Sequence, residues 1–185
     1  MVQCSILLAE YGAAGDFMSE ETTTINIKGH PVLLDADFAA DINPALWCLC
    51  RSKGTIYFIV THQHKKVRRV MLLHRIIMNA PRGMLVDHIN GNTLDNRRSN
   101  LRICTNQENA MNQRLSKNSQ SGRKGVRFIK HNPYRPWQAR IQAEGKPLYL
   151  GSFATMEEAS TAYDQAALKY HGQFAKTNLT TQEAN

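Results

Sequence analysis

Short apolar runs between residues 25 and 71 predict strands, because turn residues interrupt each run before a helix could form. Val32-Leu33-Leu34 and the longer run from Ile56 to Val60 are the clearest examples. We therefore expect a small, mostly β region here. Its large apolar side chains, Trp47 and Phe58, are expected in the core rather than in a functional site.

The pattern changes after residue 73. His74-Arg75-Ile76-Ile77-Met78 predicts a short helix, and Pro81-Arg82-Gly83 ends it before a strand at residues 84–86. A polar loop runs to Asn100 and is followed by a strand at residues 101–104. Thr105 with Glu108 three positions later forms a capping-box pattern, which predicts a helix that carries Asn109. The order is therefore strand, loop, strand, helix.

The last third of the chain predicts a separate module. Residues 125–129, 137–141 and 148–150 alternate apolar and polar positions between turn residues, as in a three-stranded antiparallel sheet. Thr155 and Glu158 make a second capping box, and the apolar residues that follow recur at helical spacing up to Gly172. One amphipathic helix should therefore pack across this sheet.

Together these elements predict an α+β fold class with two compact modules. The segment QRLSKNSQSGRK between them is polar, basic and without periodicity, as in an interdomain linker. We expect residues 1–24 to form a partly flexible N-terminal segment and residues 25–112 to form a β-rich lead-in with the strand-loop-strand-helix domain. Residues 113–124 are expected to form a basic linker. Residues 125–179 are expected to form the sheet-and-helix domain, and residues 180–185 a tail.

Charge is distributed unevenly along the 185 residues, which carry a net charge of +8. Residues 1–60 hold 3 basic and 7 acidic side chains, residues 61–125 hold 13 and 3, and residues 126–185 hold 7 and 5. A basic middle indicates a polyanion-binding surface, most commonly for nucleic acid, with an anionic membrane surface as the competing interpretation.

The chain contains no apolar run near the roughly 20 residues that a membrane span needs, and no secretory signal. We therefore expect an intracellular protein without a membrane partner. The four cysteines do not pair into a recognisable framework and are expected to be reduced and structural. His62 and His64 are expected to face solvent or phosphate, because no acidic or thiolate partner for a metal lies near them in the sequence.

Asp87-His88, at the end of a predicted strand, is the strongest candidate for chemistry. Hydrolysis of a phosphodiester needs an activated water and a cation to neutralise charge on the phosphate. Neutral imidazole can activate the water, and Asp87 can bind a metal together with an oxygen of Asn109. Taken alone, an Asp-His pair followed by an Asn-rich loop is more often a surface turn.

A longer pattern resembles the HNH homing endonucleases of phages and mobile introns over about residues 70–112. It comprises His74-Arg75-Ile76-Ile77, Val86-Asp87-His88-Ile89-Asn90-Gly91-Asn92-Thr93-Leu94-Asp95-Asn96-Arg97, Asn100-Leu101-Arg102 and Asn106-Gln107-Glu108-Asn109. The resemblance implies a ββα-metal finger that cleaves DNA.

The same resemblance implies roles for individual residues. His88 would be the general base, and Asp87 and Asn109 would hold one divalent metal, magnesium with manganese as the alternative. Asn100 would hydrogen-bond the loop backbone and so hold His88 in position. Other members have His where this chain has Asn109, which implies a modest metal affinity. For His74 a packing role and a position near the phosphate or metal are equally open.

The basic side chains around this motif are candidates for phosphate contacts, which position a duplex without reading its sequence. They are Arg97, Arg98 and Arg102. A solvated basic face is the alternative, although the excess of positive charge is centred on the proposed site.

The C-terminal module resembles the Apetala-two/ethylene-response-factor DNA-binding domain over about residues 123–179. The resemblance rests on Gly125-Val126-Arg127, Trp137-Gln138-Ala139-Arg140-Ile141, Tyr149-Leu150-Gly151-Ser152-Phe153, Glu157-Glu158-Ala159, Ala162-Tyr163-Asp164, Ala166-Ala167, Gly172, Phe174-Ala175 and Asn178. It implies a sheet that lies in the major groove of DNA, where all four base pairs can be distinguished.

On this sequence four side chains take the sheet positions expected to face DNA: Arg127, Trp137, Arg140 and Tyr149. Lys124 and Lys130 are expected near the DNA backbone. For Trp137 and Tyr149, packing between sheet and helix is an equal alternative. Pro147 and Gln142 stand where the plant domains have arginine, so the plant recognition sequence does not carry over.

The sequence thus predicts an endonuclease acting on double-stranded DNA, as a monomer on DNA, that leaves 5′-phosphate and 3′-hydroxyl ends. Its expected location is the cytoplasm or nucleoid of a bacterial host, with a phage as a candidate source. The main alternative is a DNA-binding regulator with an inactive finger. A protein that binds or cleaves RNA is a third, because basic charge alone does not choose between duplexes.

Overall fold

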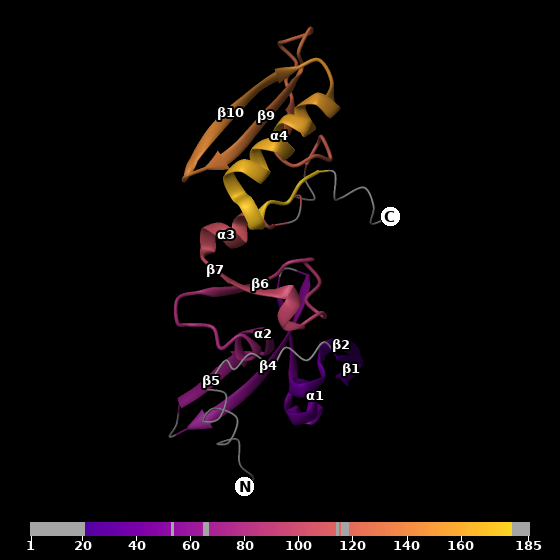
Figure 1. Cartoon of the computed structure of the whole chain (residues 1–185), viewed down its shortest axis with the longest axis vertical. Helices are drawn as coiled ribbons and strands as arrows, with labels where there is room; N and C mark the ends of the chain where they lie inside the picture. The colour runs from indigo at the N-terminus through magenta and orange to yellow at the C-terminus, as the bar shows by residue number, and fades with distance from the viewer. Residues whose placement is uncertain (1–20, 53, 65–66, 114, 116–118, 179–185) are drawn as a thin grey trace. The chain divides into compact units, whose positions relative to one another are not determined.

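The computed structural model of the chain describes residues 21–52, 54–64, 67–113, 115 and 119–178 (Figure 1). It divides into two compact units, Met1–Asn106 and Gln107–Asn185. Most of the N-terminal segment that we expected to be flexible, and all of the expected tail, lie outside the described residues. The mixture of short helices and small antiparallel sheets confirms the predicted α+β class.

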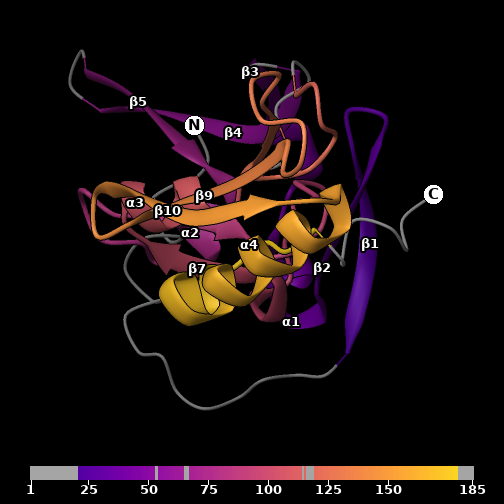
Figure 2. The same ribbon diagram turned by 90° about the horizontal axis from the view of Figure 1, so that it is seen from above.

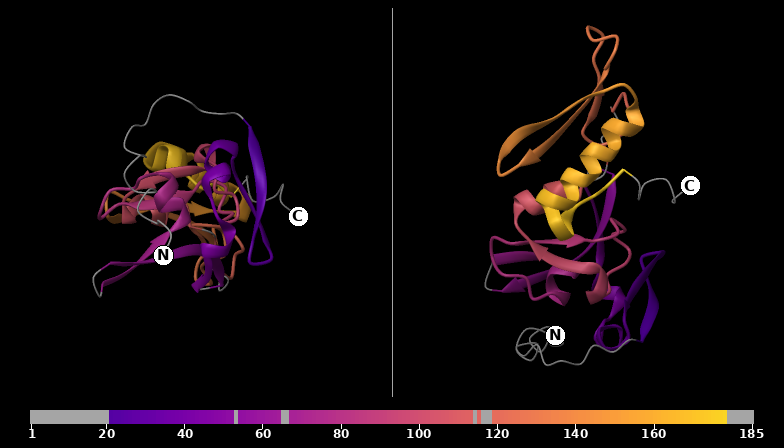
Figure 3. Two further views of the ribbon diagram at one scale, coloured as in Figure 1. Left: turned by 90° about the horizontal axis from the view of Figure 1, so that it is seen from below. Right: turned by 45° about the horizontal axis from the view of Figure 1, so that its top comes forward.

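The first unit begins with a hairpin of two antiparallel strands, β1 (Thr22–Ile27) and β2 (His30–Asp35). Lys28 and Gly29 join them with φ values of 52° and 84°, the left-handed pair that a two-residue type I′ turn requires. Helix α1 (Ala36–Asp41) follows directly and lies beside the hairpin in Figure 3. A short 3-10 helix, Pro44–Leu46, leads on to the next strand.

A three-stranded antiparallel sheet comes next, in the order β3-β4-β5. Its strands are β3 (Cys48–Ser52), β4 (Thr55–His64) and β5 (Val67–Leu72), and the short helix α2 (Leu73–Ile77) follows. The buried core of the unit combines this sheet, the hairpin and α1. As predicted, it includes Trp47 and Phe58, which are 6% and 1% exposed.

The predicted strand, loop, strand and helix are present in that order along the chain. Strand β6 (Leu85–His88) pairs antiparallel with β7 (Leu101–Cys104), and α3 (Asn106–Met111) follows. The loop between the strands ends in the 3-10 turn Arg98–Asn100. Arg75 of α2 donates to the carbonyls of Ala80, Pro81 and Met84, which fixes the turn that leads into β6.

The second unit contains an antiparallel sheet in the order β10-β9-β8, with β8 (Val126–Phe128), β9 (Trp137–Ala143) and β10 (Lys146–Phe153). Helix α4 (Met156–His171) lies across the sheet (Figure 2), and the turn Gly172–Phe174 follows it. Small and apolar side chains fill the space between sheet and helix: Val126, Ala139, Ile141, Ala159, Tyr163, Ala166 and Ala167.

Two local features of the second unit follow from its sequence. The predicted capping box of α4 forms in full, with Thr155 and Glu158 bonded to each other's backbone amides. Gly125 has a φ of 71°, and a Cβ there would lie 2.0 Å from the ring of Tyr163. Only glycine therefore lets the start of β8 approach the helix this closely.

The predicted linker at residues 113–124 falls within the second unit. Ser121 donates its hydroxyl to the carbonyl of Val126, 2.6 Å away, and the amide of Lys124 donates to Asn178 at 2.6 Å. The division between the units falls earlier, after Asn106. No helix in the described part of the chain is long and apolar enough to cross a membrane.

Candidate functional site

Asp87 and His88 end strand β6, and both side chains are buried, at 8% and 5% exposure. Successive side chains of a strand point to opposite faces, so the two lie on different sides of the β6-β7 ribbon. Asp87 lies opposite Arg102 in the register. Its Oδ2 accepts hydrogen bonds from Nε and Nη2 of Arg102 at 3.0 and 2.7 Å. The carboxylate is therefore oriented by a cation from the neighbouring strand.

The imidazole of His88 has a polar contact and an aromatic contact. Its Nε2 lies 3.2 Å from Oδ1 of Asn96. Its ring meets the ring of His74 edge to face, with 5.2 Å between the centroids. Burial lowers the pKa of His88, while the hydrogen bond to Asn96 and the nearby carboxylates of Asp87 and Asp95 act in the opposite direction. His88 is therefore neutral at physiological pH, the form that a general base needs.

His74 lies in α2 and is 6% exposed. Its ring contacts His88 and also Tyr57, whose centroid is 5.7 Å away. Burial lowers the pKa of His74 to about 3, and His88 and Arg75 add to the effect. A neutral, enclosed ring of this kind supports the imidazole of His88 by packing, which is one of the two roles considered from the sequence.

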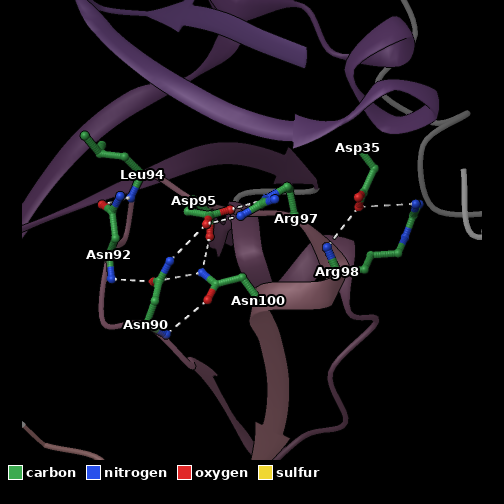
Figure 4. Close-up of polar contacts among 8 residues, drawn as sticks. All are labelled: Asp35, Asn90, Asn92, Leu94, Asp95, Arg97, Arg98 and Asn100. Atoms are coloured by element: carbon green, nitrogen blue, oxygen red, sulfur yellow. Dashed lines mark hydrogen bonds and ion pairs between the residues drawn. The ribbon is translucent and has the colours of Figure 1, made fainter. Parts of the chain in front are cut away.

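Asn100 joins both ends of the loop that follows His88, as Figure 4 shows. Its Oδ1 accepts from the amide of Asn90 at 3.0 Å, and its Nδ2 donates to the carbonyl of Asp95 at 2.8 Å. The side chains of Asn90, Asn92 and Asp95 continue this network along the loop. Asn100 thus bonds to the loop backbone, and its proposed effect on His88 stays a prediction.

The arginines expected to contact phosphate are each paired with a carboxylate of the first unit. Arg97 binds both oxygens of Asp95, at 2.8 and 2.7 Å, and this guanidinium lowers the pKa of Asp95. Arg102 binds Asp87, as described above. Their side chains are 33% and 12% exposed. Arg97 therefore offers more surface to a phosphate than Arg102 does.

Arg98 connects the loop to the N-terminal hairpin (Figure 4). Its amide donates to Oδ2 of Asp35 at 2.9 Å, and its Nη1 donates to Asp37 at 2.8 and 2.9 Å. This guanidinium lowers the pKa of Asp37. Asp35 and Asp37 had not been singled out from the sequence, since 63 and 61 residues separate them from Arg98.

Asn109 lies in α3, in the second unit, and its side chain is half-buried. No group of three His, Cys, Asp or Glu side chains gathers into a metal-binding cluster anywhere in the described ranges. The predicted ligands are only two groups, the carboxylate of Asp87 and the carboxamide of Asn109, and two groups do not make such a cluster. Both groups are hard oxygen donors of the kind that magnesium binds together with several waters, so the donor set fits this metal.

The sheet of the second unit presents a polar face away from α4. Arg127 lies opposite Gln138, and Tyr149 lies opposite Arg140 in the register. Since Ala139 and Ile141 alternate with these positions on β9 and are buried against α4, the polar side chains share the other face. Arg127 donates to Gln138 at 2.8 Å, and the guanidinium of Arg140 lies 6.0 Å from the centre of the Tyr149 ring.

Trp137 lies on the other side of the sheet from Arg140. It packs against the core formed with α4, and its ring meets Phe128 edge to face at 5.2 Å. Between the two roles considered from the sequence, this position favours packing. Tyr149, in contrast, is 54% exposed on the polar face.

The two lysines expected near DNA have different surroundings. Lys130 is exposed just after β8. Lys124 is half-buried, and its ammonium donates to the carbonyl of Met111. Burial lowers the pKa of Lys124 to about 8, and the positive charge of Lys176 contributes. Lys130 therefore has the more accessible charge of the two.

These features define a protein in which two strands and a helix, β6, β7 and α3, follow one another in the β-β-α order of a nuclease and precede a sheet packed on one helix. An HNH endonuclease family model matches residues 72–111. An uncharacterised HNH endonuclease of Acanthamoeba polyphaga mimivirus is 36% identical over 114 residues, covering 58% of this chain and 57% of that protein. Protein 3.8 of Escherichia phage T7 is 34% identical over 96 residues, covering 52% of this chain and 77% of that protein.

A different group of relatives matches a shorter part of the chain. The AP2-like ethylene-responsive transcription factor ANT of Arabidopsis thaliana is 53% identical over 52 residues, 27% of this chain and 9% of the factor. The chain belongs to the HNH endonuclease family and contains an AP2-like domain. It spans little more than half the length of its mimivirus relative.

Proposed function

We propose that the protein is a metal-dependent endonuclease, of the homing type, that hydrolyses phosphodiester bonds in double-stranded DNA. The observation that carries the proposal is the buried, neutral imidazole of His88 next to Asp87, at the strand end that the HNH family match covers. His88 serves as the general base that takes a proton from the attacking water.

Asp87 and Asn109 hold a divalent metal, magnesium or alternatively manganese. When bound, this ion neutralises charge on the phosphate and on the leaving oxygen. The pairing of Asp87 with Arg102 keeps the carboxylate in place, since both N–H donors of Arg102 meet the same oxygen, Oδ2. The expected products carry 5′-phosphate and 3′-hydroxyl ends.

The AP2-like unit supplies the second contact with DNA, through Arg127, Arg140 and Tyr149 on its exposed sheet face. Two binding modules on one chain raise the effective concentration of each at its part of the site. The protein accordingly acts as a monomer on DNA. We further propose a phage as the source, since one relative is a protein of phage T7, and the cytoplasm or nucleoid of a bacterial host as the place of action.

Cleavage of a supercoiled plasmid tests this function. Wild-type protein with magnesium should convert the plasmid to open-circular or linear DNA, and His88→Ala should lower the rate by at least about 100-fold, as expected for loss of a general base. His30→Ala removes a half-buried histidine at the start of β2 and leaves the contacts of Leu33 and Asp35 with the β6-β7 loop in place, so this control should cleave normally.

The competing function is a DNA-binding regulator with an inactive finger. Gel-shift measurements on the same three proteins distinguish the two. If wild type and His88→Ala bind duplex DNA equally well and neither cuts the plasmid with magnesium or manganese, the protein is a binder and the nuclease proposal fails. An excess of RNA should leave a specific DNA complex intact, whereas its displacement would favour RNA as the ligand.

A further inference from the structure

Asn96, in the loop between β6 and β7, is the most deeply buried polar side chain around His88. It is 1% exposed. Its carboxamide has partners at both ends: Nδ2 donates to the carbonyl of Thr93 at 3.0 Å, and Oδ1 lies 3.2 Å from Nε2 of His88. A buried asparagine held in this way is able to influence the imidazole directly.

The contact with Thr93 determines which end of the carboxamide faces the imidazole. A carbonyl can only accept a hydrogen bond, so the atom of Asn96 next to Thr93 is the NH2 group. The oxygen of Asn96 is then the atom that meets His88. Because this oxygen also can only accept, Nε2 of His88 must carry a proton. In the neutral ring the basic lone pair therefore lies on Nδ1.

The N-terminal hairpin holds Asn96 in turn. The amide of Asn96 donates to the carbonyl of Leu33 at 2.8 Å, and the amide of Leu33 donates to the carbonyl of Leu94 at 2.9 Å. Leu33 belongs to β2 and pairs with the loop as a parallel bridge at Asp95. The link between Arg98 and Asp35 lies next to this bridge. The loop at Asn96 is thus fixed by backbone hydrogen bonds to a strand outside the region that the family model matches.

We propose that Asn96 is a positioning residue for His88, which fixes the neutral imidazole in its Nε2–H form so that Nδ1 accepts the proton of the attacking water. The β1-β2 hairpin keeps Asn96 in place for this task. The role in catalysis rests on the proposed nuclease function, whereas the protonation of Nε2 can be measured without it. Asn96 does not touch the reacting atoms and acts only through His88.

A purely structural role for Asn96 would also make its replacement harmful, so the test needs a readout from the ring itself. Long-range ¹H–¹⁵N NMR spectra distinguish a protonated ring nitrogen from an unprotonated one. The experiment uses the metal-free full chain at pH 8, with the His88 signals assigned by their loss in His88→Gln. Circular dichroism and thermal unfolding establish that each variant is folded.

Three variants separate the outcomes. Asn96→Leu has similar volume but no acceptor, and its His88 ring should distribute the proton between both nitrogens. Asn96→Asp keeps an acceptor and should keep Nε2 protonated. Asn92→Ala, in the same loop, removes a side chain that accepts from the amide of Leu94 and has no described contact with His88 or Asn96, so its His88 ring should match wild type. An unprotonated Nε2 in wild type, or an unchanged ring in folded Asn96→Leu, would overturn the proposal.

Cleavage rates give a second readout. Asn96→Leu should lower kcat by about 10- to 100-fold, as for other residues that orient a catalytic group, with KM little changed. Asn96→Asp should recover part of that loss. If wild type cleaves no plasmid at all, the nuclease function fails, while the NMR result still decides whether Asn96 sets the protonated nitrogen. An equal loss of kcat in Asn96→Leu and Asn96→Asp would show that Asn96 has a structural role only.

Discussion

The charged side chains near His88 are arranged in matched pairs. Arg97 with Asp95 and Arg102 with Asp87 bring guanidinium and carboxylate groups together within about 3 Å. A basic composition over residues 61–125 therefore overstates the positive charge that is free to meet DNA. Of these two arginines, Arg97 has the more exposed side chain, at 33% against 12% for Arg102.

The buried histidines predict how stability depends on pH. Folding lowers the pKa of His74 from 6.5 to about 3. Below pH 6.5 the unfolded chain takes up a proton that the folded chain does not, so stability falls with decreasing pH by up to about 1.4 kcal/mol per unit. His88 contributes in the same direction. Above pH 6.5 this contribution is constant.

Denaturant unfolding at pH 5.0, 5.75, 6.5 and 7.25 measures the effect. His74→Leu removes the titrating group, so the free energy of unfolding should depend on pH less steeply than in wild type, by up to about 1 kcal/mol per unit below pH 6.5. Identical slopes for the two proteins would show that His74 is not kept neutral by burial.

At the scale of elements, the N-terminal hairpin and the β6-β7 loop form one structural piece. The bridge between Leu33 and Asp95 and the bonds from Arg98 to Asp35 and Asp37 connect segments about 60 residues apart in sequence. The HNH family model covers β6, β7 and α3 but not the hairpin, so the family match alone does not reveal this connection. The contacts of Leu33, Asp35 and Asp37 with the loop are therefore expected to affect both stability and cleavage.

Asp35 and Asp37 provide a matched comparison, because both bind Arg98. Asp35 is 7% exposed, and its carboxylate accepts from both the amide and the guanidinium of Arg98, so loss of this buried charge in Asp35→Asn should lower the free energy of unfolding by about 1–3 kcal/mol. Asp37 has an exposed side chain, and a surface ion pair of this kind contributes at most about 1 kcal/mol. Asp37→Asn should therefore lower the free energy of unfolding by less than Asp35→Asn does.

Chemical denaturation of the two variants, with plasmid cleavage measured in parallel, checks this difference. A loss of stability for Asp37→Asn as large as for Asp35→Asn would mean that the buried charge of Asp35 contributes no more than the exposed charge of Asp37.

The elements show where sequence reasoning succeeded. Residues 101–104 form the predicted strand, and the capping box of Thr155 and Glu158 starts α4 as predicted. Such features depend on neighbouring residues, so local patterns reveal them. The α1 helix was not predicted, because its six residues are too few to show a helical period.

Around the site, the sequence identified Asp87, His88 and Asn100 as candidate functional residues. It did not identify Asn96, although Asn96 lies within the HNH-like motif. Asparagine in a polar loop is usually turn chemistry, and only the fold shows that this one is buried against an imidazole. Asp35 and Asp37 were missed for a different reason, since nothing local marks partners more than 60 residues away.

In the whole molecule, the proposed general base and the sheet face expected to bind DNA lie in different units. The Asp87-His88 pair belongs to the first, and the sheet face with Arg140 belongs to the second. A substitution on the sheet face should therefore change affinity and leave the chemical step intact.

Arg140→Ala should weaken binding to duplex DNA and lower the slope of log K against log salt by about 1, as for the loss of one phosphate contact. The single-turnover cleavage rate at saturating protein should stay at the wild-type value. Lys169→Ala removes a positive charge from α4 of the same unit and serves as the control. An equal loss of affinity in both variants would mean that net charge, rather than the sheet face, determines binding.

Chemical rescue shows whether His88 is the general base. His88→Gly leaves a cavity in place of the imidazole, and its single-turnover cleavage of duplex DNA should be at least about 100-fold slower than wild type. Added imidazole should restore part of that rate, in proportion to the concentration of its neutral form. Cleavage by His88→Gly at the wild-type rate, with or without imidazole, would exclude His88 as the general base.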